Sequence, residues 1–169
     1  SHYIDLADDR RFVCDISSLN NSALNSDVLV VSGASSVPGL SSTVIDGFID
    51  QFSSLTEIDF AIAPGNQADR GKATVRGILS YTGHPFRVLV KGNWISRYGW
   101  MSSRKLYFNN LIGRRWLANV DIPDLELFPK RYGPLNTVTF QAGLELSVLH
   151  FGMVFMALLA KLGLVKDWS

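Results

Sequence analysis

The sequence is poor in cysteine and has no excess of charge of either sign. Its 169 residues include one cysteine, Cys14, so no disulfide can form within the chain, and this usage is typical of a reducing compartment. The 16 lysines and arginines nearly balance the 15 aspartates and glutamates, which gives a net charge of +1. Because there is no basic excess, we expect no nucleic-acid partner. We also expect the protein to be cytoplasmic.

Several signatures of ligand-binding chains are also missing. No Gly-x-Gly-x-x-Gly motif follows either of the first two strand-like segments, so the dinucleotide fingerprint is absent. Segment 65–73 is one residue too long for a phosphate loop and ends in Ala73 instead of a hydroxyl residue, which disfavours a nucleoside triphosphate site. The three histidines, His2, His84 and His150, lack the spacing of metal ligands, so we expect no metal.

The most informative segment is 28–42, where an apolar run enters a bend rich in glycine, serine and proline. Val28–Val31 predicts a strand that is covered on both faces. Ser41 or Ser42 is a candidate N-cap for the helix predicted to follow. The bend would then join the carboxyl end of a strand to a helix, which is where ligands usually bind in open α/β sheets.

The rest of the chain predicts strands interrupted by few helices. Thr56–Ile62 alternates polar and apolar residues, as a half-buried strand does, and Gly71–Tyr81 predicts a helix. Two extended runs around Lys91-Gly92-Asn93 predict a hairpin, and the prolines at 123–134 predict loops with a short helical turn. The pattern favours an α/β (α+β) chain in which a two-stranded remnant gives way near Pro38 to a mixed, largely antiparallel sheet with helices on one face.

The predicted last element is a long hydrophobic helix over Leu144–Leu164. It has 15 uncharged residues between Glu145 and Lys161, fewer than the roughly 20 that a membrane-spanning helix needs. A buried core or dimer helix is the favoured interpretation, and a role at a membrane surface is the alternative.

Two short motifs place cations beside aromatic residues, Arg114-Arg115-Trp116 and Lys130-Arg131-Tyr132. Such groups can bind a carboxylate or a phosphate, although surface residues flanking secondary structure are the more frequent explanation. Asp121 and Asp124 bracket Ile122-Pro123, and turn caps explain them better than paired acid/base catalysis does.

Taken in order, several motifs resemble one known family. They are Tyr3–Leu6, Val28–Ser36, Val37–Ser42 with its Pro-Gly turn, Thr56–Gly65, Gly71–Val75 and Ile78–Gly83. Together they are similar to the saccharopine dehydrogenase-like NAD(P)-dependent oxidoreductases, and the resemblance covers most of the chain.

This resemblance implies a division at the Pro-Gly turn. Residues 1–37 would be the C-terminal part of a Rossmann-like domain, and residues 38–169 would be the substrate and dimerisation domain. The chain would then be a fragment of a longer enzyme that transfers hydride between NAD(P) and an amino acid-like substrate. Because the fragment lacks the glycine fingerprint, we expect it to be inactive by itself and to bind no cofactor tightly.

The same resemblance suggests residues for two ligand sites but no catalytic residue. Those beside the nicotinamide would be Gly33, Ser35, Ser36, Pro38 and Gly39. Those that could bind a substrate carboxylate are Arg76, Arg114 and Arg115.

A second hypothesis comes from another class of protein. In it, the chain is a non-catalytic module that uses its apolar C-terminal helix for self-association or membrane contact, because large exposed apolar surfaces usually mark interfaces. The two hypotheses are compatible, and under either we expect a homodimer, with membrane contact less favoured.

Overall fold

The structure, a computed structural model, describes residues 1–67 and 71–169 and divides into two compact units. The first unit comprises Ser1–Glu57 and Ile122–Leu135, and the second comprises Ile58–Asp121 and Asn136–Ser169. The domain boundary expected between residues 37 and 38 stays a prediction. The segment that approximates a phosphate loop, 65–73, lies partly outside the described residues.

The first unit contains a small parallel sheet. Strands β1 (Tyr3–Ile4) and β2 (Val30–Val31) pair in parallel, with Tyr3 opposite Val30 and Ile4 opposite Val31. The connection between them is helical and consists of α1 (Arg10–Asp15), η1 (Ile16–Leu19) and α2 (Asn20–Asn25). The prediction that Val28–Val31 is covered on both faces is wrong, since Leu29 is 57% exposed and β2 only half-buried. A sheet of two short strands has too few neighbours to cover both faces.

The remainder of the first unit is helical. A five-residue turn, η2 (Ser36–Leu40), leads into α3 (Ser41–Phe48) and η3 (Ile49–Gln51). No side chain caps α3, whose N-cap is Leu40, so the expectation of a serine cap is wrong. Helix α5 (Asp124–Arg131) continues through Pro129, where loops and a short turn were expected. Its inward face is fixed by Leu125 and Phe128, which are fully buried.

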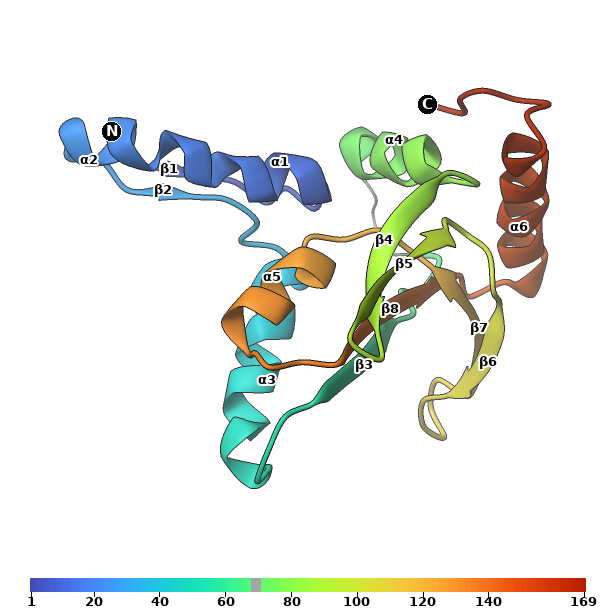
Figure 1. The fold of residues 1–169 in the computed structure, drawn as a ribbon. Helices are drawn as coiled ribbons and strands as arrows, with labels where there is room; N and C mark the ends of the chain where they lie inside the picture. The colour runs from blue at the N-terminus through green and yellow to red at the C-terminus, as the bar shows by residue number, and fades with distance from the viewer. Residues whose placement is uncertain (68–70) are drawn as a thin grey trace. The chain divides into compact units, whose positions relative to one another are not determined.

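The second unit is built on a six-stranded sheet (Figure 1). Its strands run in the order β5-β4-β8-β7-β6, and β3 also pairs with β8. The bounds are β3 (Glu57–Ile62), β4 (Pro85–Val90), β5 (Asn93–Tyr98), β6 (Arg104–Tyr107), β7 (Arg114–Asn119) and β8 (Thr137–Gly143). The β4–β5, β4–β8, β6–β7 and β7–β8 pairs are all antiparallel. The predicted hairpin at Lys91-Gly92 is confirmed, and both residues have the positive φ of a type I′ turn.

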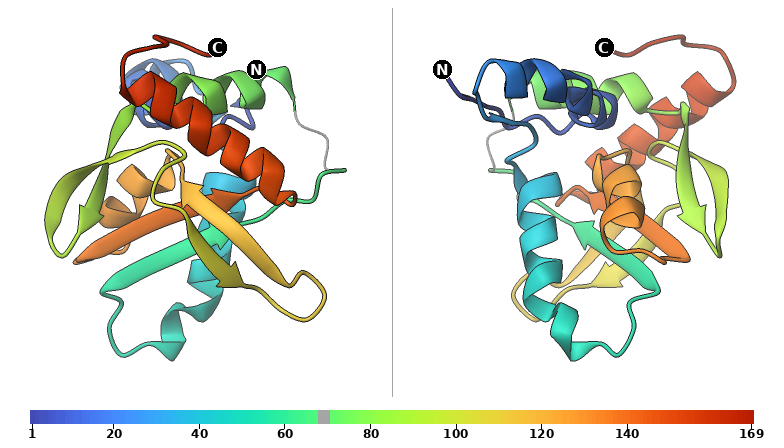
Figure 2. Two further views of the ribbon diagram at one scale, coloured as in Figure 1. Left: turned by 90° about the vertical axis from the view of Figure 1, so that its right-hand side faces the viewer. Right: turned by 60° about the vertical axis from the view of Figure 1, so that its left-hand side comes forward.

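Two helices complete the second unit. Helix α4 (Lys72–Tyr81) confirms the predicted helix. Helix α6 (Ser147–Lys161) packs on β7 (Figure 2) and is shorter than the 144–164 expected. A Cβ added at Gly83 would lie 2.3 Å from the carbonyl oxygen of Ala157. The backbone of α6 therefore packs against Gly83 at a distance that leaves no room for a side chain.

The chain is therefore of the mixed α/β class, as predicted, and its larger sheet is formed by antiparallel pairs. Within the described residues, no helix has both the length and the apolar character needed to cross a membrane.

Candidate functional site

A groove in the first unit lies where β2 ends and the Pro-Gly turn begins. Its volume is about 630 Å³, within the roughly 300–1,000 Å³ typical of small-molecule sites. It is lined by Val31, Ser32, Gly33, Ala34, Pro38, Gly39, Ser42, Thr43, Asp46, Leu127, Lys130 and Arg131. The groove thus joins the carboxyl end of a parallel strand to α3 and α5, the position expected for a ligand in an α/β sheet.

The floor of this groove is held by Asp5, which follows β1. Its carboxylate accepts hydrogen bonds of 2.9 Å from the backbone N–H groups of Gly33 and Ala7 and from the Ser32 hydroxyl. These bonds, led by that from Gly33, lower the pKa of Asp5 to about 2, because they favour the charged form. Sequence reasoning missed Asp5, which directly follows β1 in the structure.

The two glycines of the turn are required by its own packing. Gly33 has a φ of +77°, and a Cβ there would lie 2.9 Å from Cδ of Pro38. A Cβ on Gly39 would lie 3.3 Å from the Gly33 carbonyl oxygen. Their missing side chains therefore let the turn close on itself.

Of the five residues predicted beside a nicotinamide, the groove brings three together. Gly33, Pro38 and Gly39 line it. Ser35 and Ser36 do not appear in its wall, and the carbonyl oxygen of Ser35 instead accepts a hydrogen bond of 2.9 Å from the Leu40 N–H.

A buried carboxyl group lies behind the turn. Asp124, at the start of α5, is fully buried, and its Oδ1 contacts the Ser41 hydroxyl. Burial raises the pKa of Asp124 to about 6, partly offset by the Ser41 contact. The expectation that Asp124 caps a turn is wrong, since its side chain bonds to α3 and caps nothing.

The Ser41 hydroxyl has two neighbours that are acceptors when Asp124 is ionised. Its Oγ lies 3.0 Å from the Pro38 carbonyl oxygen and also contacts Asp124, but a hydroxyl has one proton to donate. Both contacts are satisfied when a protonated Asp124 donates to Ser41 and Ser41 donates to Pro38. Burial favours the neutral carboxyl group, and in that form its proton is linked through Ser41 to the Pro-Gly turn.

Two cations of α5, Lys130 and Arg131, line the groove, and each lies beside an acid. Arg131 pairs with Asp46 at 2.6 Å, and Lys130 pairs with Glu126 at 3.1 Å. The Tyr132 hydroxyl also donates to Asp46, at 2.7 Å. Both cations remain more than half exposed, so an anionic ligand can reach them.

The three arginines predicted to bind a substrate carboxylate all lie in the second unit. Arg76 is an exposed residue of α4. Arg114 and Arg115 are successive residues of β7, and successive strand residues point to opposite faces. The structure therefore does not bring these arginines together, and their role stays a prediction.

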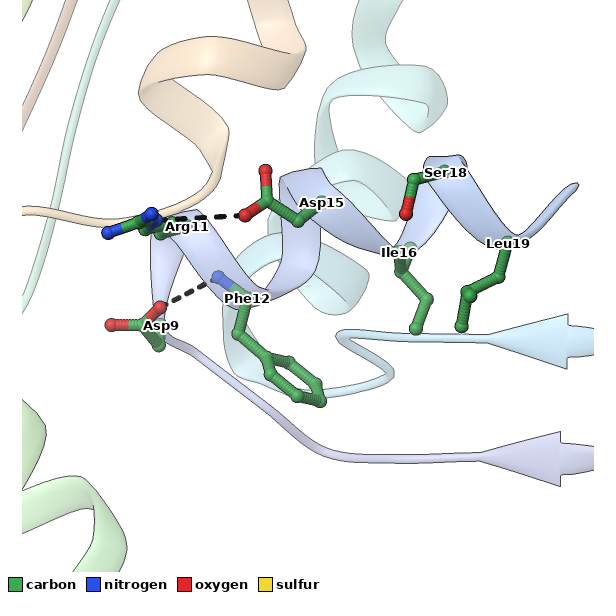
Figure 3. Close-up of a pocket in the computed structure, with 7 residues that line it drawn as sticks. All are labelled: Asp9, Arg11, Phe12, Asp15, Ile16, Ser18 and Leu19. Atoms are coloured by element: carbon green, nitrogen blue, oxygen red, sulfur yellow. Dashed lines mark hydrogen bonds and ion pairs between the residues drawn. The ribbon is translucent and has the colours of Figure 1, made fainter.

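A second hollow, of about 430 Å³, follows α1 and η1 (Figure 3). The side chains of Phe12, Ile16 and Leu19 point to one side of this segment, while Arg11 and Asp15 form an ion pair of 3.7 Å. This hollow offers an apolar strip with few convergent polar groups, so it lacks the means to orient a reacting molecule.

The second unit contains one serine–histidine contact. Ser103 Oγ lies 2.9 Å from Nε2 of His150, which is fully buried between Trp100 and Trp116. Burial lowers the pKa of His150, so the neutral imidazole is favoured. No acid orients its Nδ1, which has no hydrogen-bond partner within the described part of the chain. His150 is therefore a buried core histidine and not a catalytic base.

No group of three or more metal-ligating side chains occurs in residues 1–67 and 71–169. A scan against models of protein families found no match to the chain. A search of curated proteins also found none. The groove and its surroundings are therefore the basis on which function can be argued.

Proposed function

We propose that this chain is part of a saccharopine dehydrogenase-like oxidoreductase and that its groove receives the reacting end of a nicotinamide cofactor. The observation that carries the proposal is the position of the groove, at the carboxyl end of a parallel strand pair and against Gly33, Pro38 and Gly39. The ordered resemblance of the motifs around the Pro-Gly turn supports the same family. In this proposal β1 and β2 are the last strands of a Rossmann-like sheet.

The groove suits one end of a dinucleotide better than it suits a complete dinucleotide. Its volume of about 630 Å³ suits a drug-sized fragment, and Lys130 and Arg131 offer positive charge to a phosphate or carboxylate. The missing Gly-x-Gly-x-x-Gly means that the pyrophosphate would be held by residues outside this sequence. The bound nicotinamide would supply the hydride chemistry.

The chain's own groups would position ligands. The turn at Pro38 and Gly39 would present a fixed surface to the nicotinamide, because Asp5 and Asp124 hold it from two sides. Lys130 would orient the anionic group of a substrate or cofactor. Arg76, Arg114 and Arg115 remain the proposed carboxylate ligands in the second unit.

Titration with NADPH and NADH, followed by nicotinamide fluorescence, tests the proposal on this chain and on the longer protein that it implies. We expect the longer protein to bind one of them and this chain to bind both weakly. Lys130→Ala in the longer protein should weaken binding or raise the substrate KM by about 10-fold, as expected for a lost charged hydrogen bond. The matched control is Lys72→Ala, which removes an exposed lysine of α4 and should change neither. A longer protein that binds neither nucleotide would contradict the proposal.

A further inference from the structure

The outward face of α6 carries a regular apolar stripe. Its members are Val148, Phe151, Phe155, Leu158 and Leu162, which are between 42% and 73% exposed. They follow one another at spacings of three, four, three and four residues, which is the a/d repeat by which two helices pack along a common seam. We call these five residues the α6 seam.

The opposite face of the helix is the one that packs on the second unit. His150, Ala157 and Ala160 are buried there. Phe151 lies at the border and meets Trp116 edge-on, with ring centroids 5.2 Å apart. The α6 seam is therefore additional to the face that the fold already uses.

The charges on α6 permit two copies of the seam to approach each other. In this fully described helix the only side chain with a formal charge is Lys161, and its Nζ lies 4.4 Å above the ring centroid of Tyr98. Gly152, beside the seam, has no atom within 4 Å of an added Cβ, so a second backbone can come close. Two identical seams would meet without like charges between them.

The size of the seam also suits self-association. Five large side chains, each about half exposed, present on the order of 500 Å² of apolar surface when a large side chain carries about 150–250 Å². Two such seams would together hide about 1,000 Å² of surface, which is the lower limit for a specific interface.

We infer that the α6 seam is the interface with a second copy of this chain, packed as an antiparallel helix pair about a two-fold axis. Phe155 is the middle residue of the seam, so it would face its own counterpart. Phe151 would lie opposite Leu158, and Val148 opposite Leu162, which matches large side chains with smaller ones. A two-fold axis makes such a surface self-complementary. The inference rests on α6 alone and holds whether or not the groove binds a nicotinamide.

Light scattering and sedimentation of the chain, with and without a charge at the centre of the seam, test this interface. The native chain should be a dimer, and Phe155→Glu should raise the dimer Kd at least about 100-fold, since two carboxylates would then face each other. Mixing Phe155→Glu with Phe155→Lys should restore dimers. Leu111→Glu, a control on a residue 93% exposed in the β6–β7 loop, should leave the dimer intact. Circular dichroism checks that every variant is folded.

Cysteine crosslinking then tests the antiparallel arrangement, in a chain whose Cys14 is replaced by serine. Phe155→Cys should form a crosslinked dimer, and Val148→Cys should not crosslink with itself but should crosslink with Leu162→Cys. A monomeric native chain, a dimer that Phe155→Glu leaves unchanged, or crosslinking of Val148→Cys with itself would each overturn the inference. So would a monomer that floats with phospholipid vesicles, because the seam would then contact a membrane.

Discussion

The two units bury their apolar side chains in different ways. Within Ser1–Glu57 the buried apolar side chains are Val13, Val37 and Pro38, whereas Ile122–Leu135 contributes a cluster: Ile122, Pro123, Leu125, Phe128, Tyr132 and Leu135. The second unit instead spreads its core over paired strands, among them Val88, Leu89, Leu117, Val138 and Phe140. Both units therefore join two segments distant in sequence, but the second unit also contains two local hairpins, β4–β5 and β6–β7.

This difference bears on the groove. The strands β1 and β2 have two residues each, and a sheet of this size has little stability of its own. Ile4, Leu6 and Leu29 beside them remain 57–69% exposed. The groove consequently owes its shape to α5, which supplies both its charged wall and the buried Asp124 behind its turn.

The largest change in the free energy of unfolding should come from truncating one large core side chain in each unit. Phe128 in the first unit and Leu117 in the second are both fully buried. We expect Phe128→Ala to cost about 3–5 kcal/mol and Leu117→Ala about 2–5 kcal/mol. Phe128→Ala should raise hydrogen exchange throughout 1–57, and Leu117→Ala should raise it in β6, β7 and β8.

Hydrogen exchange followed by mass spectrometry makes this comparison, with chemical denaturation for the free energies. The matched surface control is Leu111→Ala, which alters an exposed side chain and should change neither unit. If Phe128→Ala raised exchange equally in both units, the chain would unfold as one body and the contrast between the units would be lost.

A smaller effect is expected from Asp124, and it depends on pH. Its folded pKa of about 6 lies above the usual value near 3.8, so the folded state binds the proton more tightly than the unfolded state does. Stability should therefore fall as pH rises from about 4 to above 6 and then level off. The difference of about two pKa units corresponds to about 3 kcal/mol.

Asp124→Asn should remove this pH dependence. The amide can donate to the Ser41 hydroxyl as the neutral carboxyl group does. We expect the variant to be more stable than the native chain at pH 8 and similar to it at pH 4, as measured by thermal unfolding. Asp15→Asn, at a side chain 71% exposed, serves as the control. Equal melting temperatures of the Asp124→Asn and native proteins at pH 8 would show that Asp124 is ionised there at no cost.

The smallest change in stability should come from removing one ion pair in each unit. Arg10 pairs with Glu126 at 2.9 Å and is mostly buried, whereas Arg104 pairs with Asp59 at 2.8 Å and is 42% exposed. We expect Arg10→Ala to cost about 1 kcal/mol and Arg104→Ala no more than about 0.5 kcal/mol. Denaturant unfolding at low and high salt measures both, and the Arg104 effect should shrink more as salt rises. The opposite ranking would mean that α1 is not held to α5 by this pair.

Sequence patterns were most informative where neighbouring residues decide the structure. The alternation in Thr56–Ile62 and the Lys91-Gly92 turn predicted β3 and the β4–β5 hairpin, because strand period and turn type are local properties. The end of α6 is also local in origin, since Gly163 follows it with a φ of +75°, which glycine adopts readily. Three residues that line the groove, Gly33, Pro38 and Gly39, had been suggested by the family resemblance.

Patterns failed where a distant segment supplies the missing partner. Nothing near Asp124 in the sequence indicates that its carboxyl group contacts Ser41, which is 83 residues away. The burial of β2 was overestimated because an apolar run does not state how many strands surround it. The length of helix α5 was underestimated as a short helical turn because Pro129 argues locally against a helix. The burial of Leu125 and Phe128 overrides that preference.

By itself, the sequence determined the mixed α/β class, the hairpins of the second unit, the Pro-Gly bend and the apolar character of α6, since each depends on the order of adjacent residues. Only the tertiary structure decided that α5 closes the groove, that Asp124 is buried against Ser41, and that the α6 seam faces outward. These features depend on contacts between segments far apart in the chain. Such contacts set the burial of α5, the pKa of Asp124 and the exposure of the α6 seam.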